Sequence, residues 1–233
     1  MIKAVVFDMD GVLFDTERLS MESWRKAAVQ MGLGDIEEGI YGCIGLNRTD
    51  CKIFLEKTYG KDFPYEAFRR KTSQLFSHRV ETEGLPIMKG TEELLDWLAG
   101  QKVKIALASS TSTGAVKSHL ERAGFTDYFQ EIVGGDMVEH SKPLPDIYLK
   151  ACTLLGVEPG EAAAIEDSPN GIRSAHAAGM LPIMVPDLVE PTAEIRAMLY
   201  GNCNNLLEVK EFLQKRLDGA ADTRDGDGRA RPC

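Results

Sequence analysis

Residues 2–15 read IKAVVFDMDGVLFD, an apolar run that ends in closely spaced acidic residues. The part from Ile2 to Phe7 is short and rich in β-branched side chains, which is typical of a strand buried on both faces of a parallel sheet. Asp8 and Asp10 follow it, and a spacing of two places both carboxylates on one side of an extended chain. Two such carboxylates repel each other unless a cation or a proton relieves them, so we expect a metal site at this strand end. Taken alone, the motif fits a solvated acidic turn equally well.

Three further apolar runs predict additional strands of the same sheet. They cover residues 103–108 (VKIALA), 162–165 (AAAI) and 181–185 (LPIMV), and segments with a helical pattern separate them. Strands that alternate with helices form parallel sheets with right-handed crossovers. The sequence therefore predicts the α/β class, with a Rossmann-like parallel sheet flanked by helices.

The stretch from residue 15 to residue 88 contains no convincing strand and has the pattern of several helices, one of them with Ile53 and Phe54 on its apolar face. We expect a helical cap domain over 15–88, inserted into an α/β core domain over 1–14 and 89–217. A cap rooted there would overhang the carboxyl ends of the strands, where open α/β sheets bind ligands. Residues 218–233 contain no Val, Ile, Leu, Phe, Tyr or Trp, so we expect them to form a disordered tail.

The charge, the cysteine spacing and the lengths of the apolar runs limit the kinds of molecule that the protein can bind. The chain has 233 residues, with 27 Lys and Arg against 36 Asp and Glu, and this net charge of −9 argues against binding to nucleic acid or to anionic lipid. The five cysteines are scattered without the spacing of a zinc site, and no run approaches the length of a membrane span. We expect a cytoplasmic monomer without a membrane or nucleic-acid partner.

Three other segments offer polar side chains near predicted strand ends. Ser109 opens the hydroxyl-rich run 109–113, which suits either a phosphate or an ordinary helix cap. Lys142 lies in HSKPLPD, where the prolines would hold the backbone extended, although a loop lysine is usually only solvated. Glu166 and Asp167 form a second acidic pair in IEDSPNG, which alone could be capping chemistry.

The combination is more specific than any single segment, because parallel strands bring their carboxyl ends to one edge of the sheet. The acidic, hydroxyl and lysine side chains of these segments then assemble into an Mg²⁺-dependent phosphoryl-transfer site. An aspartate nucleophile in such a site can form an acyl-phosphate and divide one hard displacement into two easier ones.

The ordered motifs DMDGV, ASST, KPLPD and EDSPNG resemble those of the haloacid dehalogenase superfamily, in the branch with a helical cap after the first strand. The resemblance covers residues 1 to about 217. It implies that Asp8 is the nucleophile and that Asp10 acts as general acid and then as general base. It also implies that Ser109 and Lys142 hold the transferring phosphoryl group, and that the Mg²⁺ ligands are Asp8, Asp167, Glu166 and the backbone carbonyl of Asp10.

Within this branch the chain most resembles β-phosphoglucomutase and its phosphatase relatives. The segment GLNRT at 45–49 is similar to the cap loop that faces the substrate, which makes Arg48 a candidate to bind a second anionic group or simply a surface arginine. The mutases carry a His five residues after the aspartate that begins the first cap helix, and Ser20 occupies that position here. We therefore expect a phosphatase for a small phosphorylated metabolite, such as a sugar phosphate. The alternatives are a sugar-phosphate mutase and, more remotely, a phospho-receiver signalling domain.

Overall fold

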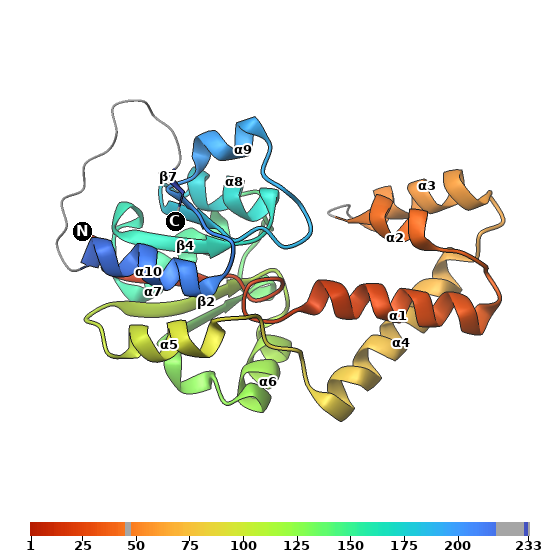
Figure 1. Ribbon diagram of the computed structural model, residues 1–233, viewed down its shortest axis with the longest axis horizontal. Helices are drawn as coiled ribbons and strands as arrows, with labels where there is room; N and C mark the ends of the chain where they lie inside the picture. The colour runs from red at the N-terminus through yellow and green to blue at the C-terminus, as the bar shows by residue number, and fades with distance from the viewer. Residues whose placement is uncertain (45–47, 218–230, 233) are drawn as a thin grey trace. The chain divides into compact units, whose positions relative to one another are not determined.

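The computed structural model describes residues 1–44, 48–217 and 231–232 (Figure 1). The chain divides into two compact units, a core unit of Met1–Phe14 with Ile87–Cys233 and a cap unit of Asp15–Pro86. The sequence placed the end of the cap at residue 88, and the compact cap unit ends at Pro86. The predicted tail at 218–233 lies outside the described residues, except for Arg231 and Pro232.

The core unit is built on one parallel sheet, which confirms the predicted fold class. Its strands run in the order β3-β2-β1-β4-β5-β6-β7, and each pairs in parallel with its neighbour. The strands are β1 (Ala4–Phe7), β2 (Lys104–Ser109), β3 (Glu131–Gly134), β4 (Ala162–Glu166), β5 (Leu181–Met184), β6 (Gly201–Asn202) and β7 (Arg231–Pro232). β3 and β6 were not predicted because each is short and carries little apolar patterning. β7 lies in the segment that was expected to be disordered, where backbone pairing with β6 needs no apolar side chain.

Register sets the strand ends level with one another. Phe7 at the end of β1 pairs with Leu107 of β2 on one side and with Ile165 of β4 on the other. These three strands therefore end within two residues of these positions, at the same edge of the sheet. This alignment brings Asp8, Ser109 and Glu166 to the same part of the core unit.

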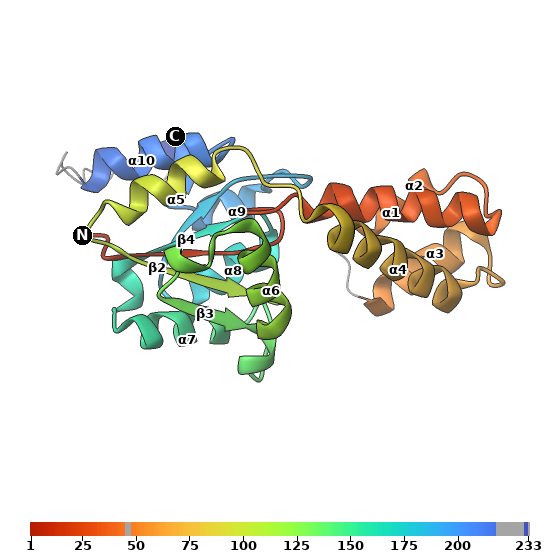
Figure 2. The same cartoon turned by 90° about the horizontal axis from the view of Figure 1, so that it is seen from below.

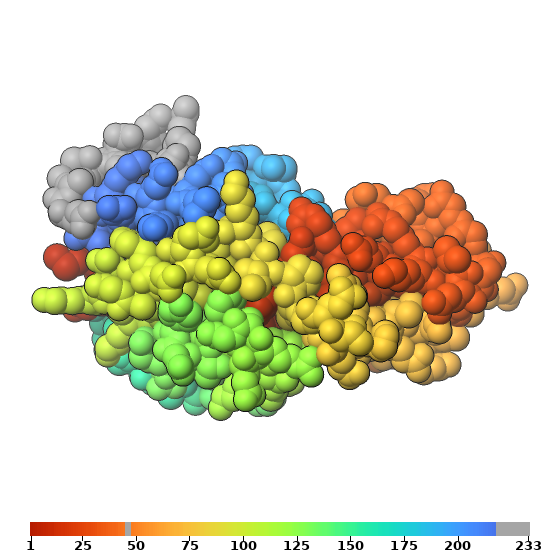
Figure 3. Space-filling model, turned by 60° about the horizontal axis from the view of Figure 1, so that its bottom comes forward, coloured from red at the N-terminus to blue at the C-terminus, as the bar shows by residue number. Residues whose placement is uncertain are grey.

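Helices cover both faces of the sheet (Figures 1 and 2). On one face α7 (Asp146–Leu155) and α8 (Pro169–Ala177) bury apolar side chains against small residues of β1, β2 and β4. On the other face α5 (Thr91–Ala99) and α10 (Leu206–Leu217) lie side by side, and Figure 3 shows their outer surfaces in yellow and blue. The remaining helical elements of this unit are α6 (Thr113–Ala123), α9 (Ala193–Met198) and the 3₁₀ turns Thr126–Tyr128, Gly135–Met137 and Pro159–Glu161.

The cap unit is helical, with α1 (Thr16–Met31), α2 (Glu37–Cys43), α3 (Arg48–Tyr59) and α4 (Tyr65–Glu83). Asp15 caps α1 by accepting a hydrogen bond from the Arg18 backbone N–H. Inside the unit, the Trp24 ring meets the Phe68 ring edge-on at 5.3 Å between centroids. Ile53 was expected on the buried face of its helix, but it is 58% exposed, because Cys51 and Leu55 are the buried residues of α3.

None of the helices in the described part of the chain combines the length and the apolar composition that a membrane crossing requires. Cys43, Cys51 and Cys152 are free thiols. Cys203 is disulfide-bonded, which its isolated position in the sequence did not predict.

Candidate active site

Asp8 lies at the centre of the candidate site. It follows β1, its backbone N–H donates to the carbonyl of Ile165 at 2.9 Å, and its side chain is almost completely buried. A carboxylate in this position cannot be stabilised by bulk water. Its charge must therefore be balanced by other groups at the same sheet edge.

Lys142 supplies part of that balance. Its Nζ donates to Asp8 Oδ1 and to Glu166 Oε1, each at 2.6 Å, and to the carbonyl of Ala108 at 3.0 Å. Its side chain is only 7% exposed. The segment around it forms a turn rather than the extended chain expected from its prolines, since the Leu144 N–H donates to the Ser141 carbonyl at 3.0 Å. The structure thus places the predicted lysine between two of the predicted acids.

Glu166 is held on both carboxylate oxygens. Oε1 accepts from Lys142 and from the Tyr148 hydroxyl at 2.7 Å, while Oε2 accepts from the Ser168 hydroxyl at 3.2 Å. Burial raises the pKa of Tyr148 well above its usual value, so this hydroxyl remains a donor. Sequence reasoning missed Tyr148, because an aromatic residue at the start of a helix reads as core. The only signal was its place in the segment that begins with Lys142.

Two glycines make room for the acidic side chains. A Cβ on Gly171, in the first turn of α8, would lie 1.9 Å from the Glu166 carboxyl carbon or oxygen. A Cβ on Gly11 would lie 2.3 Å from Asp167 Oδ2, and Gly11 also adopts a φ of +75°. Both positions therefore exclude any side chain while the carboxylates occupy their present places.

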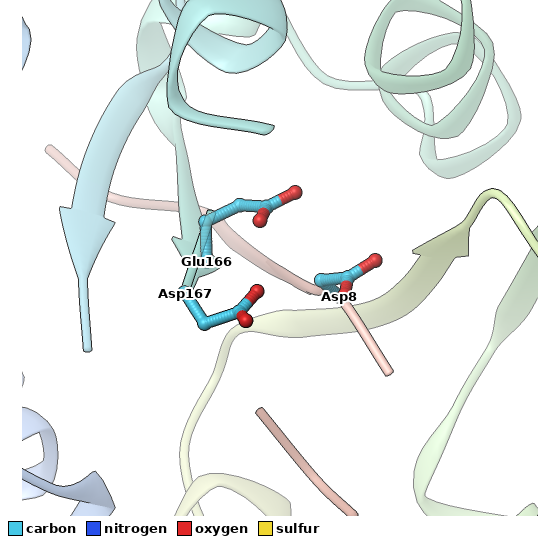
Figure 4. A group of neighbouring side chains, drawn as sticks. All are labelled: Asp8, Glu166 and Asp167. Carbon is cyan, nitrogen blue, oxygen red and sulfur yellow. The ribbon is translucent and has the colours of Figure 1, made fainter. Parts of the chain in front are cut away.

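The acids converge on one point. Asp8, Glu166 and Asp167 each offer an oxygen, and these oxygens lie within 4.8 Å of one another. Figure 4 shows Glu166 and Asp167 extending from the end of β4 toward the end of β1, which carries Asp8. Burial raises the pKa of Asp8 to about 7; Lys142 opposes this shift, and the nearby charges of Glu166 and Asp10 add to it. A divalent cation fits this donor set, because it would relieve the repulsion and favour carboxylate oxygens.

Asp10 is held apart from that cluster by hydroxyl groups. Its Oδ2 accepts from the Thr111 hydroxyl at 3.0 Å and from the Ser109 hydroxyl at 3.4 Å. Ser109 is completely buried, and its Oγ also accepts from the Thr111 backbone N–H at 3.0 Å. The hydroxyl run therefore orients Asp10 in addition to any role toward a phosphate, and Thr111 is a member of the site that the sequence did not single out.

Arg48 and Ser20 belong to the cap unit. Arg48 is exposed at the start of α3 and pairs with Glu66 at 3.1 Å. Ser20, on α1, lines a cavity of about 310 Å³ with Glu17, Met21, Trp24, Ile40, Cys43 and Ile44. No histidine lines this cavity in the part of the chain that the structure describes. The segment 45–47 of the predicted cap loop lies outside the described residues.

A family model, curated proteins and solved structures all relate the chain to the same group of proteins. Residues 5–185 match the sequence model of a family described as haloacid dehalogenase-like hydrolase. A phosphorylated carbohydrates phosphatase from Thermotoga maritima is 33% identical over 213 residues, which cover 91% of this chain and 97% of the relative. A β-phosphoglucomutase from Bacillus subtilis is 33% identical over 192 residues, which cover 79% and 83%. A crystal structure of a Thermotoga maritima protein superposes with a TM-score of 0.78 at 29% identity, covering 92% of this chain and 99% of the other.

Proposed function

Because the chain belongs to the haloacid dehalogenase-like hydrolase family, we propose that it is an Mg²⁺-dependent phosphatase of a small phosphomonoester, which acts through an aspartyl-phosphate on Asp8. The observation that carries the proposal is the buried contact of Asp8 with Lys142, beside the acidic pair at the end of β4. A structural ion pair would need only one acid, whereas three acids share this position.

The first half of the proposed reaction is a displacement at phosphorus. An Asp8 oxygen forms a bond to phosphorus while the bond from phosphorus to the leaving oxygen breaks. Asp10 protonates that oxygen, so the alcohol leaves neutral. Lys142 holds Asp8 in place and offsets negative charge that gathers on the transferring group.

The second half releases phosphate. Asp10, now a carboxylate, takes a proton from a water molecule as the water oxygen attacks phosphorus, and the acyl-phosphate bond to Asp8 breaks. Thr111 and Ser109 hold the Asp10 carboxylate in one orientation for both proton transfers. Asp8, Asp167, Glu166 and the Asp10 backbone carbonyl would hold Mg²⁺. The ion supplies charge that lets a dianionic substrate approach an acidic site.

The substrate class follows from relatives and from the cap unit. The first relative is named for phosphorylated carbohydrates, and another, from Escherichia coli, is a fructose-1-phosphate phosphatase that is 30% identical over 182 residues. The cap cavity combines the Trp24 ring with the polar groups of Glu17 and Ser20, and a small hydroxylated molecule can use both kinds of surface. We therefore infer that the substrate is a sugar phosphate or a similar metabolite, without a nucleic-acid or membrane partner.

Arg48 is the candidate for recognising a second anionic group on the substrate. Arg48→Ala should raise KM mainly for bisphosphates or phosphorylated sugar acids, because a charge-assisted hydrogen bond contributes about 1.5–3 kcal/mol. Arg69→Ala is the matched control, since Arg69 also lies near Glu66, at 3.9 Å. Equal effects of the two substitutions would contradict the assignment of Arg48.

A sugar-phosphate mutase is the second candidate, since a β-phosphoglucomutase is among the relatives. The sixteen residues of α1 include no histidine, and Ser20 occupies the position where the mutases have one. We infer that water competes well for the aspartyl-phosphate when that histidine is missing. This favours hydrolysis over transfer to a second hydroxyl.

The deciding experiment follows two products in one assay. The purified protein is incubated with Mg²⁺ and a panel of phosphomonoesters, including β-glucose 1-phosphate with a bisphosphate primer. Inorganic phosphate and isomerised sugar phosphate are measured together. We expect phosphate release to be faster on the preferred substrate. Faster isomerisation would replace the phosphatase with the mutase, and absence of both activities would reject the proposal. Ser20→His should slow hydrolysis on the same panel.

A further inference from the structure

Two cysteines of the cap unit meet across a helix boundary. Cys43 ends α2 and Cys51 lies in the first turn of α3. Cys51 Sγ and Cys43 Sγ lie 2.8 Å apart, within hydrogen-bond distance, and Cys43 Sγ lies 3.7 Å from the Cys51 carbonyl oxygen. Both are free thiols. Their separation of eight residues does not predict this contact, because packing of α2 on α3 creates it.

The two sulfurs have different surroundings. Cys51 is buried, and the Cys43 thiol lowers its pKa by stabilising the thiolate; burial opposes this shift and the Tyr65 hydroxyl adds to it. The pKa of Cys43 is raised, first by its hydrogen bond with Cys51 and then by burial. Cys43 is half-buried and lines the cap cavity. The two sulfurs are therefore in contact, and Cys43 is the one that a small molecule in the cap cavity can reach.

We propose that Cys43 and Cys51 are a reversible oxidation site, which forms an intramolecular disulfide when a hydroperoxide enters the cap cavity. The thiolate of one cysteine attacks one oxygen of hydrogen peroxide, the O–O bond breaks, and a sulfenic acid and hydroxide form. The sulfur of the other cysteine then attacks the oxidised Sγ and displaces the hydroxyl group, which takes up the proton of the second thiol and leaves as water. Two thiols are oxidised, one peroxide is reduced, and the hydroxide takes up the proton released from the first thiol to give the second water.

The third free thiol provides an internal contrast. Cys152 lies in α7 of the core unit and is 2% exposed. Burial raises its pKa to about 11, with a smaller effect from Glu158, so little thiolate is present at neutral pH. Cys152 should therefore stay reduced under conditions that oxidise the pair.

We expect oxidation of the two cysteines to affect substrate selection, and this expectation rests on the proposed function. Cys43 is part of the cavity wall, and Arg48 lies between the two cysteines in the sequence. A disulfide would join the end of α2 to the first turn of α3, which carries Arg48. We expect oxidation to raise KM for the preferred phosphomonoester by at least about threefold.

The chemical test uses intact full-length protein and peptide masses. The protein is treated with a few equivalents of hydrogen peroxide, the peroxide is removed with catalase, and remaining thiols are alkylated in denaturant. Trypsin cuts after Arg48 and Lys52, so Cys43 and Cys51 fall in separate peptides, 27–48 and 49–52. We expect these peptides to be linked, with the Cys152 peptide alkylated, and we expect dithiothreitol to separate them. Alkylation of both peptides, or earlier oxidation of Cys152, would overturn the proposal.

Two variants test the sulfenic acid step. In Cys43→Ser and in Cys51→Ser the remaining cysteine has lost its partner, so its sulfenic acid should persist and be trapped by a cyclic 1,3-dione. Absence of trapping in both variants would contradict the proposed chemistry. Kinetics of the reduced and the linked wild type form a separate readout. An unchanged KM in fully linked protein would remove the effect on substrate selection, while a reduced protein without phosphatase activity would instead reject the proposed function.

Discussion

Replacement of Lys142 by Met should destabilise the metal-free protein in a pH-dependent way. The substitution keeps most of the side-chain volume and removes one buried ammonium group, which donates to Asp8, Glu166 and the Ala108 carbonyl. Two carboxylates that are almost completely buried would then lose their shared positive partner. Breaking a buried ion pair from one side costs about 3–5 kcal/mol.

The loss of stability caused by Lys142→Met should be largest above neutral pH. Burial raises the folded-state pKa of Asp8 to about 7, above its unfolded value of 3.8, so the wild type without metal loses stability as the pH rises from 3.8 to about 7. The Lys142 ammonium opposes that rise in pKa, so its removal extends the loss of stability above pH 7. At about pH 8 we expect the melting temperature of the variant to fall by on the order of 10 °C. At about pH 5.5, where Asp8 is mostly protonated in both proteins, the fall should be less than half of this.

Thermal unfolding in EDTA, followed by circular dichroism at both pH values, measures the difference. Lys150→Met is the control, because Lys150 is an exposed lysine on α7, the helix that follows the turn of Lys142, and its loss should change stability by less than about 0.5 kcal/mol. A Lys142→Met variant that melts like the Lys150→Met control, or that loses the same stability at both pH values, would refute the electrostatic reasoning.

Three further outcomes follow from the same cluster. The gain in melting temperature on adding Mg²⁺ should grow as the pH rises through about 7, because the ion competes with the proton on Asp8; a gain that falls with pH would contradict this. Gly171→Ala should lower the free energy of unfolding by about 1–3 kcal/mol and raise the Mg²⁺ concentration needed for half-maximal rate, because the added Cβ would collide with Glu166. Gly114→Ala is the control and should change neither quantity, because a Cβ on Gly114 meets nothing within 4 Å. Tyr148→Phe should leave the circular dichroism spectrum unchanged and raise the same Mg²⁺ requirement several-fold, since a hydrogen bond to a charged group contributes about 1.5–3 kcal/mol; an unchanged Mg²⁺ requirement would show that the hydroxyl does not position the acid.

The sequence predicted the parts of the fold whose signal is local. The run IKAVVF and the acids after it are adjacent in the chain, so the central strand and its polar end could be identified together. β3 was missed because four residues, EIVG, do not establish a period, and its place at the sheet edge comes from pairing with β2.

Contacts that depend on tertiary packing could not be predicted. The hydrogen bond from the Tyr148 hydroxyl to Glu166 joins α7 to β4, and no spacing in the sequence predicts it. The contact between Cys43 and Cys51 likewise depends on how α2 packs against α3. By contrast, Lys142 could be predicted beside the acids, because its segment is one of an ordered set of polar segments that parallel strands bring to one edge of the sheet.

The central claim is that Asp8 itself carries the phosphoryl group, and trapping that group tests it most directly. The protein is mixed with Mg²⁺ and its preferred phosphomonoester, quenched in acid during steady turnover, and digested at low pH, where acyl-phosphates survive. We expect the peptide that contains Asp8 to gain the mass of one phosphoryl group, to lose it on treatment with hydroxylamine, and to show no gain in Asp8→Asn. A phosphoryl group on another residue, or an Asp8→Asn variant that retains more than about a tenth of the wild-type rate, would contradict the account.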